Sequence, residues 1–117
     1  MFPYREQSII LLALMRIIAV HTIKKFWTKH PQTEQPLKSW VEEVQKAEWS
    51  NPQELKAHFR SASIITGKRV VFNIKGNCFR MIVHVEYRLK IVFMVWIGSH
   101  KEYDLIDVKS IRYDRSD

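Results

Sequence analysis

The chain has 117 residues, of which 46% are hydrophobic and 26% are charged. That length and composition predict a single folded domain and exclude a disordered chain. Nineteen Lys and Arg residues against twelve Asp and Glu give a net charge of +7. Such an excess favours a polyanionic partner, because each cation set against a phosphate releases counterions. The charge alone does not distinguish RNA, DNA, the ribosome or an acidic protein, and solubility would also account for it.

The single cysteine, Cys78, excludes an internal disulfide and indicates a reducing compartment, so we expect a cytoplasmic protein. The five histidines lack the spacing of metal ligands, and we expect neither a metal nor another cofactor. The apolar run from Ile9 to Met15 is too short to span a bilayer and is interrupted by Arg16, so no membrane association is expected. We interpret residues 1–14 as an upstream extension outside the fold and residues 15–117 as the domain, with Met15 as the natural start.

The first half of the chain reads as one strand followed by helices. Residues 16–22 predict a short strand, and the spacing of apolar residues from Thr22 predicts a helix that Pro31 ends. A second helix is predicted where Leu37, Trp40, Val41 and Val44 recur at helical spacing. Asn51 followed by Pro52 and Glu54 is typical of a helix cap, and it predicts a third, short helix.

The second half reads as an antiparallel meander. Alternating apolar residues predict strands over 69–75 and 79–87, joined by a two-residue turn at Gly76 and Asn77, both of which tolerate positive φ. The apolar run over 91–97 predicts a strand covered on both faces. Ser99 and Glu102 have the spacing of a capping box and predict a short helix through Ile106. Helices on one face of a small sheet define an α+β fold.

The predicted first hairpin brings polar residues onto one face of the sheet. With a turn at 76–77, Asn73 lies opposite Arg80 and Arg69 lies opposite His84, and Lys75 shares their face. Such a row of nitrogen donors suits a phosphate, although it also fits an ordinary solvated sheet face.

The second hairpin extends this site toward the C-terminal helix. If Leu89 and Lys90 form its loop, Arg80 lies opposite Ser99, and His100, Lys101 and Tyr103 can reach a nucleotide held by Arg80. Structural alternatives stay open for each residue. Arg80 can pair with Glu86 or Asp104, His100 can serve only the helix start, Tyr103 can pack on the core, and Lys68 and Lys75 can solubilise turns. The four tryptophans are interpreted as packing residues, with Trp49 as the one that could instead stack on a base.

Three segments carry a family resemblance: the run from Val70 to Val83, the apolar residues 91–93, and the run from Gly98 to Asp104. Together they resemble the HigB toxins of the RelE superfamily. The resemblance implies a RelE-like fold: an N-terminal strand, two to three helices, a three-stranded antiparallel meander and a short C-terminal helix. It implies a toxin of a type II toxin–antitoxin system that cleaves mRNA without a metal, usually in the ribosomal A site. It also implies an inhibitory HigA-type antitoxin with a helix-turn-helix domain.

The residues that match the family motif are Asn73, Lys75, Arg80, His100 and Tyr103. In RNA cleavage the 2′-hydroxyl attacks the adjacent phosphate, and we assign Arg80 and Lys75 to charge stabilisation, His100 to proton transfer and Tyr103 to substrate contact. Asn73, Lys68, Arg69 and Lys101 are the expected RNA-binding residues. Two alternatives need no proton-transfer residue: a basic module that binds nucleic acid without cutting it, and a toxin of the same superfamily that poisons DNA gyrase.

Overall fold

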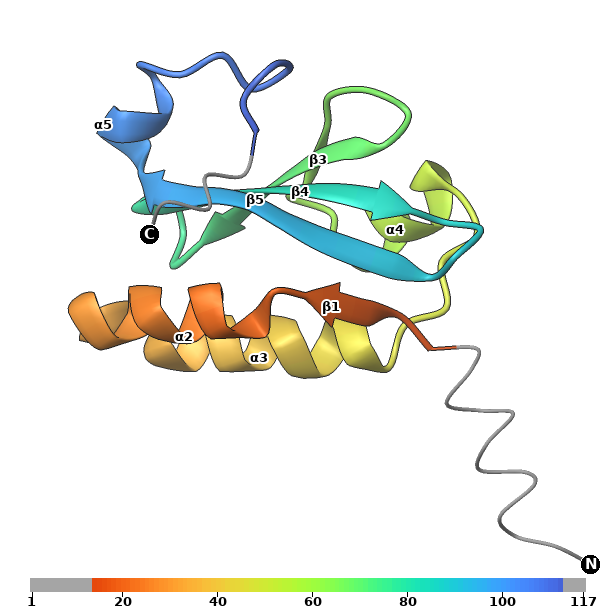
Figure 1. Cartoon of the computed structure of the whole chain (residues 1–117), viewed down its shortest axis with the longest axis horizontal. Helices are drawn as coiled ribbons and strands as arrows, with labels where there is room; N and C mark the ends of the chain where they lie inside the picture. The colour runs from red at the N-terminus through yellow and green to blue at the C-terminus, as the bar shows by residue number, and fades with distance from the viewer. Residues whose placement is uncertain (1–13, 113–117) are drawn as a thin grey trace, which may run out of the picture.

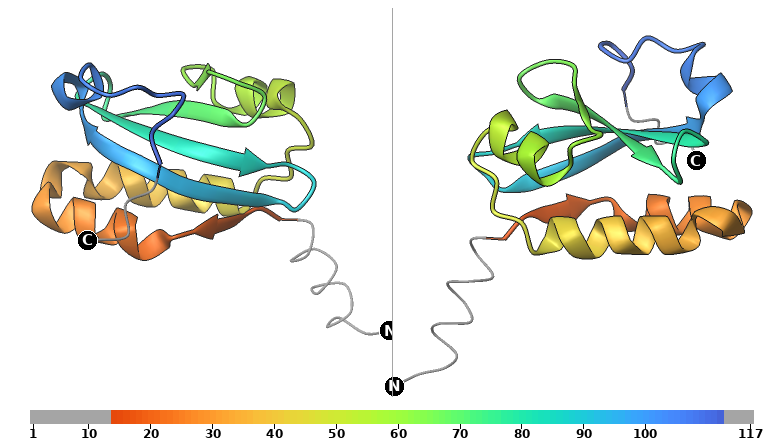
Figure 2. Two further views of the ribbon diagram at one scale, coloured as in Figure 1. Left: turned by 45° about the horizontal axis from the view of Figure 1, so that its top comes forward. Right: turned by 180° about the vertical axis from the view of Figure 1, so that it is seen from behind.

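The computed structural model describes residues 14–112. Five strands form one sheet in the order β1 (Arg16–Ile18), β5 (Ile91–Ser99), β4 (Phe79–Glu86), β3 (Arg69–Ile74) and β2 (Ser63–Ile64). Figures 1 and 2 show that the helices α2 (Val20–Lys29) and α3 (Glu34–Gln45) cover one face of this sheet, and that the segment after α5 (His100–Tyr103) crosses the other face. The α+β prediction is therefore confirmed. The interpretation of residues 1–14 as an extension concerns residues that, apart from the last, lie outside the described part of the chain.

The N-terminal strand is shorter than predicted. Strand β1 (Arg16–Ile18) runs parallel to β5, and helix α2 (Val20–Lys29) begins two residues before Thr22. The apolar run at the start of the chain has no clear period, so its pattern does not show where a strand gives way to a helix. The boundary between strand and helix follows from burial, because the earlier helix start places the Ile23 side chain in the core. Met15 is also buried there, and its backbone N–H donates to the carbonyl of Ala47 at 3.0 Å.

The other helices follow the apolar spacing closely. Pro31 ends α2 as predicted and starts a 3₁₀ turn, η1 (Pro31–Thr33), which leads into α3 (Glu34–Gln45). Helix α4 (Pro52–His58) has the predicted cap, since the Asn51 side chain accepts a hydrogen bond from the backbone N–H of Glu54 at 2.9 Å. Trp49 is buried, and its Nε1 donates to Nδ1 of His58 at 3.2 Å, so the alternative that it stacks on a base is wrong.

The first hairpin has the predicted register. Strands β3 (Arg69–Ile74) and β4 (Phe79–Glu86) pair Arg69 with His84 and Asn73 with Arg80. In the turn, positive φ occurs at Lys75 and Gly76, not at Asn77. Strand β2 (Ser63–Ile64) pairs with the start of β3 and was not predicted, because two residues carry no readable alternation.

The second hairpin departs from its predicted register. Strand β5 (Ile91–Ser99) begins with Ile91 opposite Glu86, so the turn contains four residues, 87–90, and Lys90 adopts a φ of 57°. Further along, β5 has a bulge: Val83 pairs with Met94 and Ile82 pairs with Trp96, which leaves Val95 as the extra residue. Arg80 consequently lies opposite Gly98, and the prediction that it lies opposite Ser99 is wrong.

Apolar residues cover both faces of the sheet. The main core lies between the sheet and the helices, and it includes Ile23, Leu37, Phe72 and Met81. A smaller cluster on the opposite face, which we call the second face, buries Val71, Ile82 and Val95 beneath side chains of the C-terminal segment. The prediction that the last strand is covered on both sides is confirmed. Within residues 14–112, no helix has the length and apolar character needed to cross a bilayer.

Candidate nucleic-acid site

Arg80 lies in the middle of a row of residues on the second face. Its strand partners are Asn73 on β3 and Gly98 on β5, and neighbouring positions in such a row have Cβ atoms about 5 Å apart. The guanidinium carbon of Arg80 lies 5.1 Å from the centre of the Tyr103 ring, which is a cation–π distance. The site therefore joins the amide of Asn73, the guanidinium of Arg80 and the phenol of Tyr103, which come from three separate elements.

Helix α5 (His100–Tyr103) brings Tyr103 to this position. The Ser99 side chain accepts from the backbone N–H of Glu102 at 3.1 Å, and the Glu102 carboxylate accepts from the N–H of Ser99 at 2.8 Å. The predicted capping box is therefore confirmed, whereas the prediction that the helix extends through Ile106 is wrong, because it ends at Tyr103. The backbone N–H of His100 also donates to the carbonyl of Cys78 at 3.0 Å, which ties the helix start to the β3–β4 turn. Both features lie at the same end of the sheet in Figure 1.

His100 has one polar partner and one unused nitrogen. Its Nε2 lies 3.6 Å from a carboxylate oxygen of Asp104, one helical turn away. Its Nδ1 is buried without a hydrogen-bond partner, and so is Nε of Arg80. Only four buried side-chain polar atoms in residues 14–112 lack a partner, and two of them belong to these residues. Because such atoms are costly to leave unpaired, these two nitrogens are candidates for contact with a bound group.

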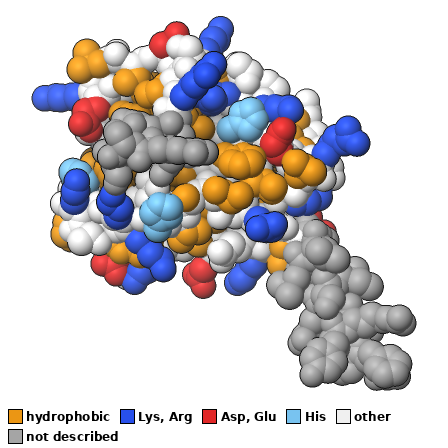
Figure 3. Space-filling view, in the orientation of Figure 1, with side chains coloured by type: hydrophobic (Ala, Val, Ile, Leu, Met, Phe, Trp, Pro, Cys, Tyr) orange, Lys and Arg blue, Asp and Glu red, His pale blue; other side chains and the backbone are white. Residues whose placement is uncertain are grey.

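Two other predicted residues lie at the same end of the sheet but are solvent-exposed. Lys75 is in the β3–β4 turn, and Lys101 is on the outer side of α5. No ion pair or hydrogen bond of either side chain is present within the described residues. Figure 3 shows Lys and Arg side chains around the margin of the visible face and apolar side chains at its centre.

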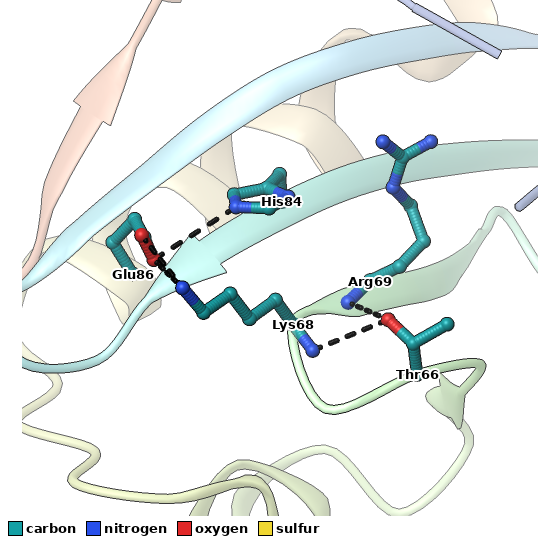
Figure 4. Close-up of polar contacts among 5 residues, drawn as sticks. All are labelled: Thr66, Lys68, Arg69, His84 and Glu86. Carbon is teal, nitrogen blue, oxygen red and sulfur yellow. Dashed lines mark hydrogen bonds and ion pairs between the residues drawn. The ribbon is translucent and has the colours of Figure 1, made fainter. Parts of the chain in front are cut away.

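Lys68 and Arg69 lie at the opposite end of β3. Strand geometry puts Arg69 about 13 Å from Asn73. As Figure 4 shows, Lys68 and His84 both point to the Glu86 carboxylate, with shortest distances of 2.6 and 3.9 Å. Nη1 of Arg69 donates to the carbonyls of Val108 and Ile111 at 3.1 and 2.8 Å. The structure thus separates these two cations from Arg80 and gives both intramolecular partners, and their role in RNA binding stays a prediction.

The surroundings of Glu102 and His84 shift the pKa of each group. The backbone N–H and hydroxyl of Ser99 lower the pKa of Glu102, which keeps this carboxylate ionised in the capping box. Burial lowers the pKa of His84 more strongly than the nearby Glu86 raises it, so the neutral imidazole is favoured. Neither group is therefore suited to donate a proton near neutral pH. No group of three or more potential metal ligands occurs within residues 14–112.

Sequence reasoning missed two members of the site. Asp104 had a readable signal, since it lies four residues after His100 and therefore on the same helical face. Trp96 had no such signal. The face of the sheet on which it lies depends on the bulge at Val95, and the residues of the strand do not predict that bulge. Its ring centre lies 6.2 Å from that of Tyr103.

A small basic α+β domain with cations and aromatic rings gathered at one end of its sheet is a candidate nucleic-acid-directed protein. The family model described as HigB_toxin, the RelE-like toxic component of a toxin–antitoxin system, matches residues 33–106, more than half of the chain. The chain belongs to this family of toxins, and its partner class is accordingly an antitoxin.

Curated relatives agree with this assignment. The mRNA interferase toxin HigB of Escherichia coli K12 is 29% identical over 92 residues, which cover 77% of this chain and 88% of the relative. Proteins named mRNA interferase HigB from Escherichia coli O157:H7 and Shigella flexneri match with the same identity and coverage.

Proposed function

We propose that this toxin is an endoribonuclease that cleaves mRNA, as the names of its relatives state for those proteins. The observation that carries the proposal is the contact between Arg80 and Tyr103, the last residue of helix α5, which begins with His100. A guanidinium with an unsatisfied Nε beside an aromatic ring can hold a phosphate while the ring contacts the nucleotide. The net charge of +7 supports attraction to RNA.

The proposed reaction uses the nucleophile that RNA itself supplies. The 2′-oxygen forms a bond to phosphorus as the bond to the 5′-oxygen breaks, leaving a 2′,3′-cyclic phosphate and a 5′-hydroxyl. Arg80 stabilises the charge that builds on the phosphate oxygens, with Lys75 as a second cation from the adjacent turn. Because the attacking group is part of the substrate and the cations are protein side chains, the proposed reaction is metal-independent.

His100 is the proposed proton carrier. An imidazole can accept the 2′-hydroxyl proton or donate to the leaving oxygen near neutral pH, and solvent exchanges the other proton. The Asp104 carboxylate at 3.6 Å from Nε2 would hold the ring in place. Tyr103 contacts the nucleotide, and Asn73, Lys101, Lys68 and Arg69 bind along the RNA backbone.

The proposed setting is the bacterial cytoplasm, with mRNA in the ribosomal A site as substrate and a HigA-type antitoxin as inhibitor. The resemblance of the segments around Arg80 and His100 to HigB toxins supports these finer assignments. The single cysteine is compatible with a reducing compartment.

The test is to express the full chain and map new RNA 5′ ends in cells and in a purified translation reaction, with and without ribosomes. Cuts in register with codons that appear with the wild type and fall at least about 100-fold in Arg80→Ala are expected. His100→Ala should lose about 10²- to 10⁴-fold in cleavage rate without unfolding. Intact transcripts during growth arrest would contradict the enzyme proposal and favour a toxin that binds nucleic acid or gyrase without cutting.

A further inference from the structure

The Trp96 indole occupies the space above Gly98. A Cβ atom built on Gly98 would lie 2.6 Å from both Cζ2 and Cη2 of Trp96, closer than real Cβ contacts come. Position 98 lies opposite Arg80 in the β4–β5 pairing, so its side chain would project from the same face as Arg80. The benzene half of the indole therefore lies on the second face, where a residue-98 side chain would otherwise neighbour Arg80.

Three groups that suit a nucleotide are thereby contiguous. The Trp96 and Tyr103 rings have centres 6.2 Å apart and planes tilted by 51°, and Arg80 lies over Tyr103 at 5.1 Å. Because the two rings are tilted rather than parallel, neither covers the other fully. The site therefore offers two aromatic surfaces beside a cation.

Trp96 also differs in burial from Trp40 and Trp49, which only pack. Trp40 and Trp49 are each 4% exposed, whereas Trp96 is intermediate in burial and sits at the edge of the smaller cluster. The bulge at Val95 places it there, since without the extra residue Trp96 would point toward the helices. A partly exposed aromatic ring beside a phosphate-binding cation is the usual arrangement for holding single-stranded nucleic acid.

We propose that Trp96 stacks on a nucleobase of single-stranded RNA adjacent to the phosphate held by Arg80, and that Gly98 is the positioning residue that makes room for the indole. This inference rests on the proposed function, and it adds a base-binding surface that the reaction itself does not require. Because every base offers a flat face, the contact contributes affinity more than sequence choice.

The test measures binding separately from cutting. A mixed-sequence RNA decamer with 2′-O-methyl groups cannot be cleaved by its own 2′-oxygen, and its binding to the full chain can be followed by tryptophan fluorescence and by anisotropy of an end label. We expect quenching with the wild type and loss of most of it in Trp96→Phe, with affinity largely kept because phenylalanine still stacks. Trp96→Leu should lose the quenching and bind about 5- to 100-fold more weakly.

Two further variants separate stacking from general damage. Trp27→Leu is the matched control, since Trp27 is a partly buried residue of α2 that packs against the main core, and it should retain both quenching and affinity. Gly98→Ala should behave like Trp96→Leu, while far-UV circular dichroism shows that it folds.

The outcomes distinguish this inference from the proposed function. Equal decamer affinity in Trp96→Leu and the wild type, or no binding of the decamer by the wild type, overturns the stacking inference and leaves cleavage to be judged by Arg80→Ala. Decamer quenching that depends on Trp96 in a protein that cuts no RNA supports the stacking surface and overturns the nuclease.

Discussion

Arg69 provides a sharp test of how the C-terminal segment is held on the sheet. Its Nη1 donates to the carbonyls of Val108 and Ile111, both part-buried contacts that span about forty residues of sequence. Ile106, Val108 and Ile111 pack on the smaller cluster beneath this contact. Arg69→Ala removes both hydrogen bonds at once and leaves two carbonyls without their donor.

The expected cost follows from the type of hydrogen bond. A hydrogen bond to a charged group contributes about 1.5–3 kcal/mol, and the two here share one nitrogen, so we expect a total loss of about 2–4 kcal/mol. Part of this loss falls on the segment alone, because local opening requires less free energy than global unfolding. The C-terminal segment should therefore open before the sheet does.

Hydrogen exchange and urea unfolding measure the two contributions. In Arg69→Ala, amides of residues 106–111 should exchange at least about tenfold faster, since 1.4 kcal/mol corresponds to a factor of ten. The urea midpoint should fall at the same time. Lys68→Ala is the matched control, because Lys68 is the neighbouring cation but its pair with Glu86 is solvent-exposed and should matter little.

Arg69→Ala also distinguishes two roles of Arg69: holding the C-terminal segment on the sheet and contacting a phosphate of RNA. If Arg69 binds RNA, its removal should reduce the slope of log affinity against log salt by about one. Unchanged exchange over residues 106–111 together with a reduced salt slope would show that Arg69 does not hold the C-terminal segment and would support its proposed role in RNA binding.

Three other predictions concern single side chains. Ser99→Ala removes one bond of the α5 capping box, which should weaken that helix by about 1 kcal/mol and slow RNA cleavage several-fold in a kinetic assay. Asn51→Ala removes the equivalent bond at α4, remote from the site, so the urea midpoint should fall comparably while the cleavage rate stays at the wild-type value; equal loss of activity in both variants would contradict the reasoning. Because burial holds the folded-state pKa of His84 below its ordinary 6.5, the resulting stability is complete above that pH and is lost as the pH falls through the folded value. The urea midpoints at pH 7.5 and 5.5 should therefore differ more for the wild type than for His84→Gln. If both proteins show the same change in midpoint between these pH values, His84 is not the source of the pH dependence.

Local signals in the sequence predicted most of the fold. Asn51 and Ser99 predicted two helix starts, because their caps depend on residues three positions away in the chain. The turn near Gly76 predicted the β3–β4 register and with it the Asn73–Arg80 pair, because a short turn constrains both strands.

Features set by distant residues were not predictable in this way. The turn at 87–90 and the bulge at Val95 depend on how β5 packs between its neighbours. Together they place Gly98 opposite Arg80, where the predicted register placed Ser99. The same bulge places Trp96 on the second face, next to the site. The engagement of Arg69 with Val108 and Ile111 depends on where the C-terminal segment lies, which no periodicity encodes.

The parallel pairing of β1 with β5 has a practical consequence for handling this toxin. Arg16 is aligned with Ile91, and β5 then runs about 26 Å before it reaches Ser99 and the helix that follows. The chain thus enters the domain at the end of the sheet farthest from Arg80 and His100. A tether that immobilises the protein through this entry point would leave the opposite end, which carries Arg80 and His100, unobstructed.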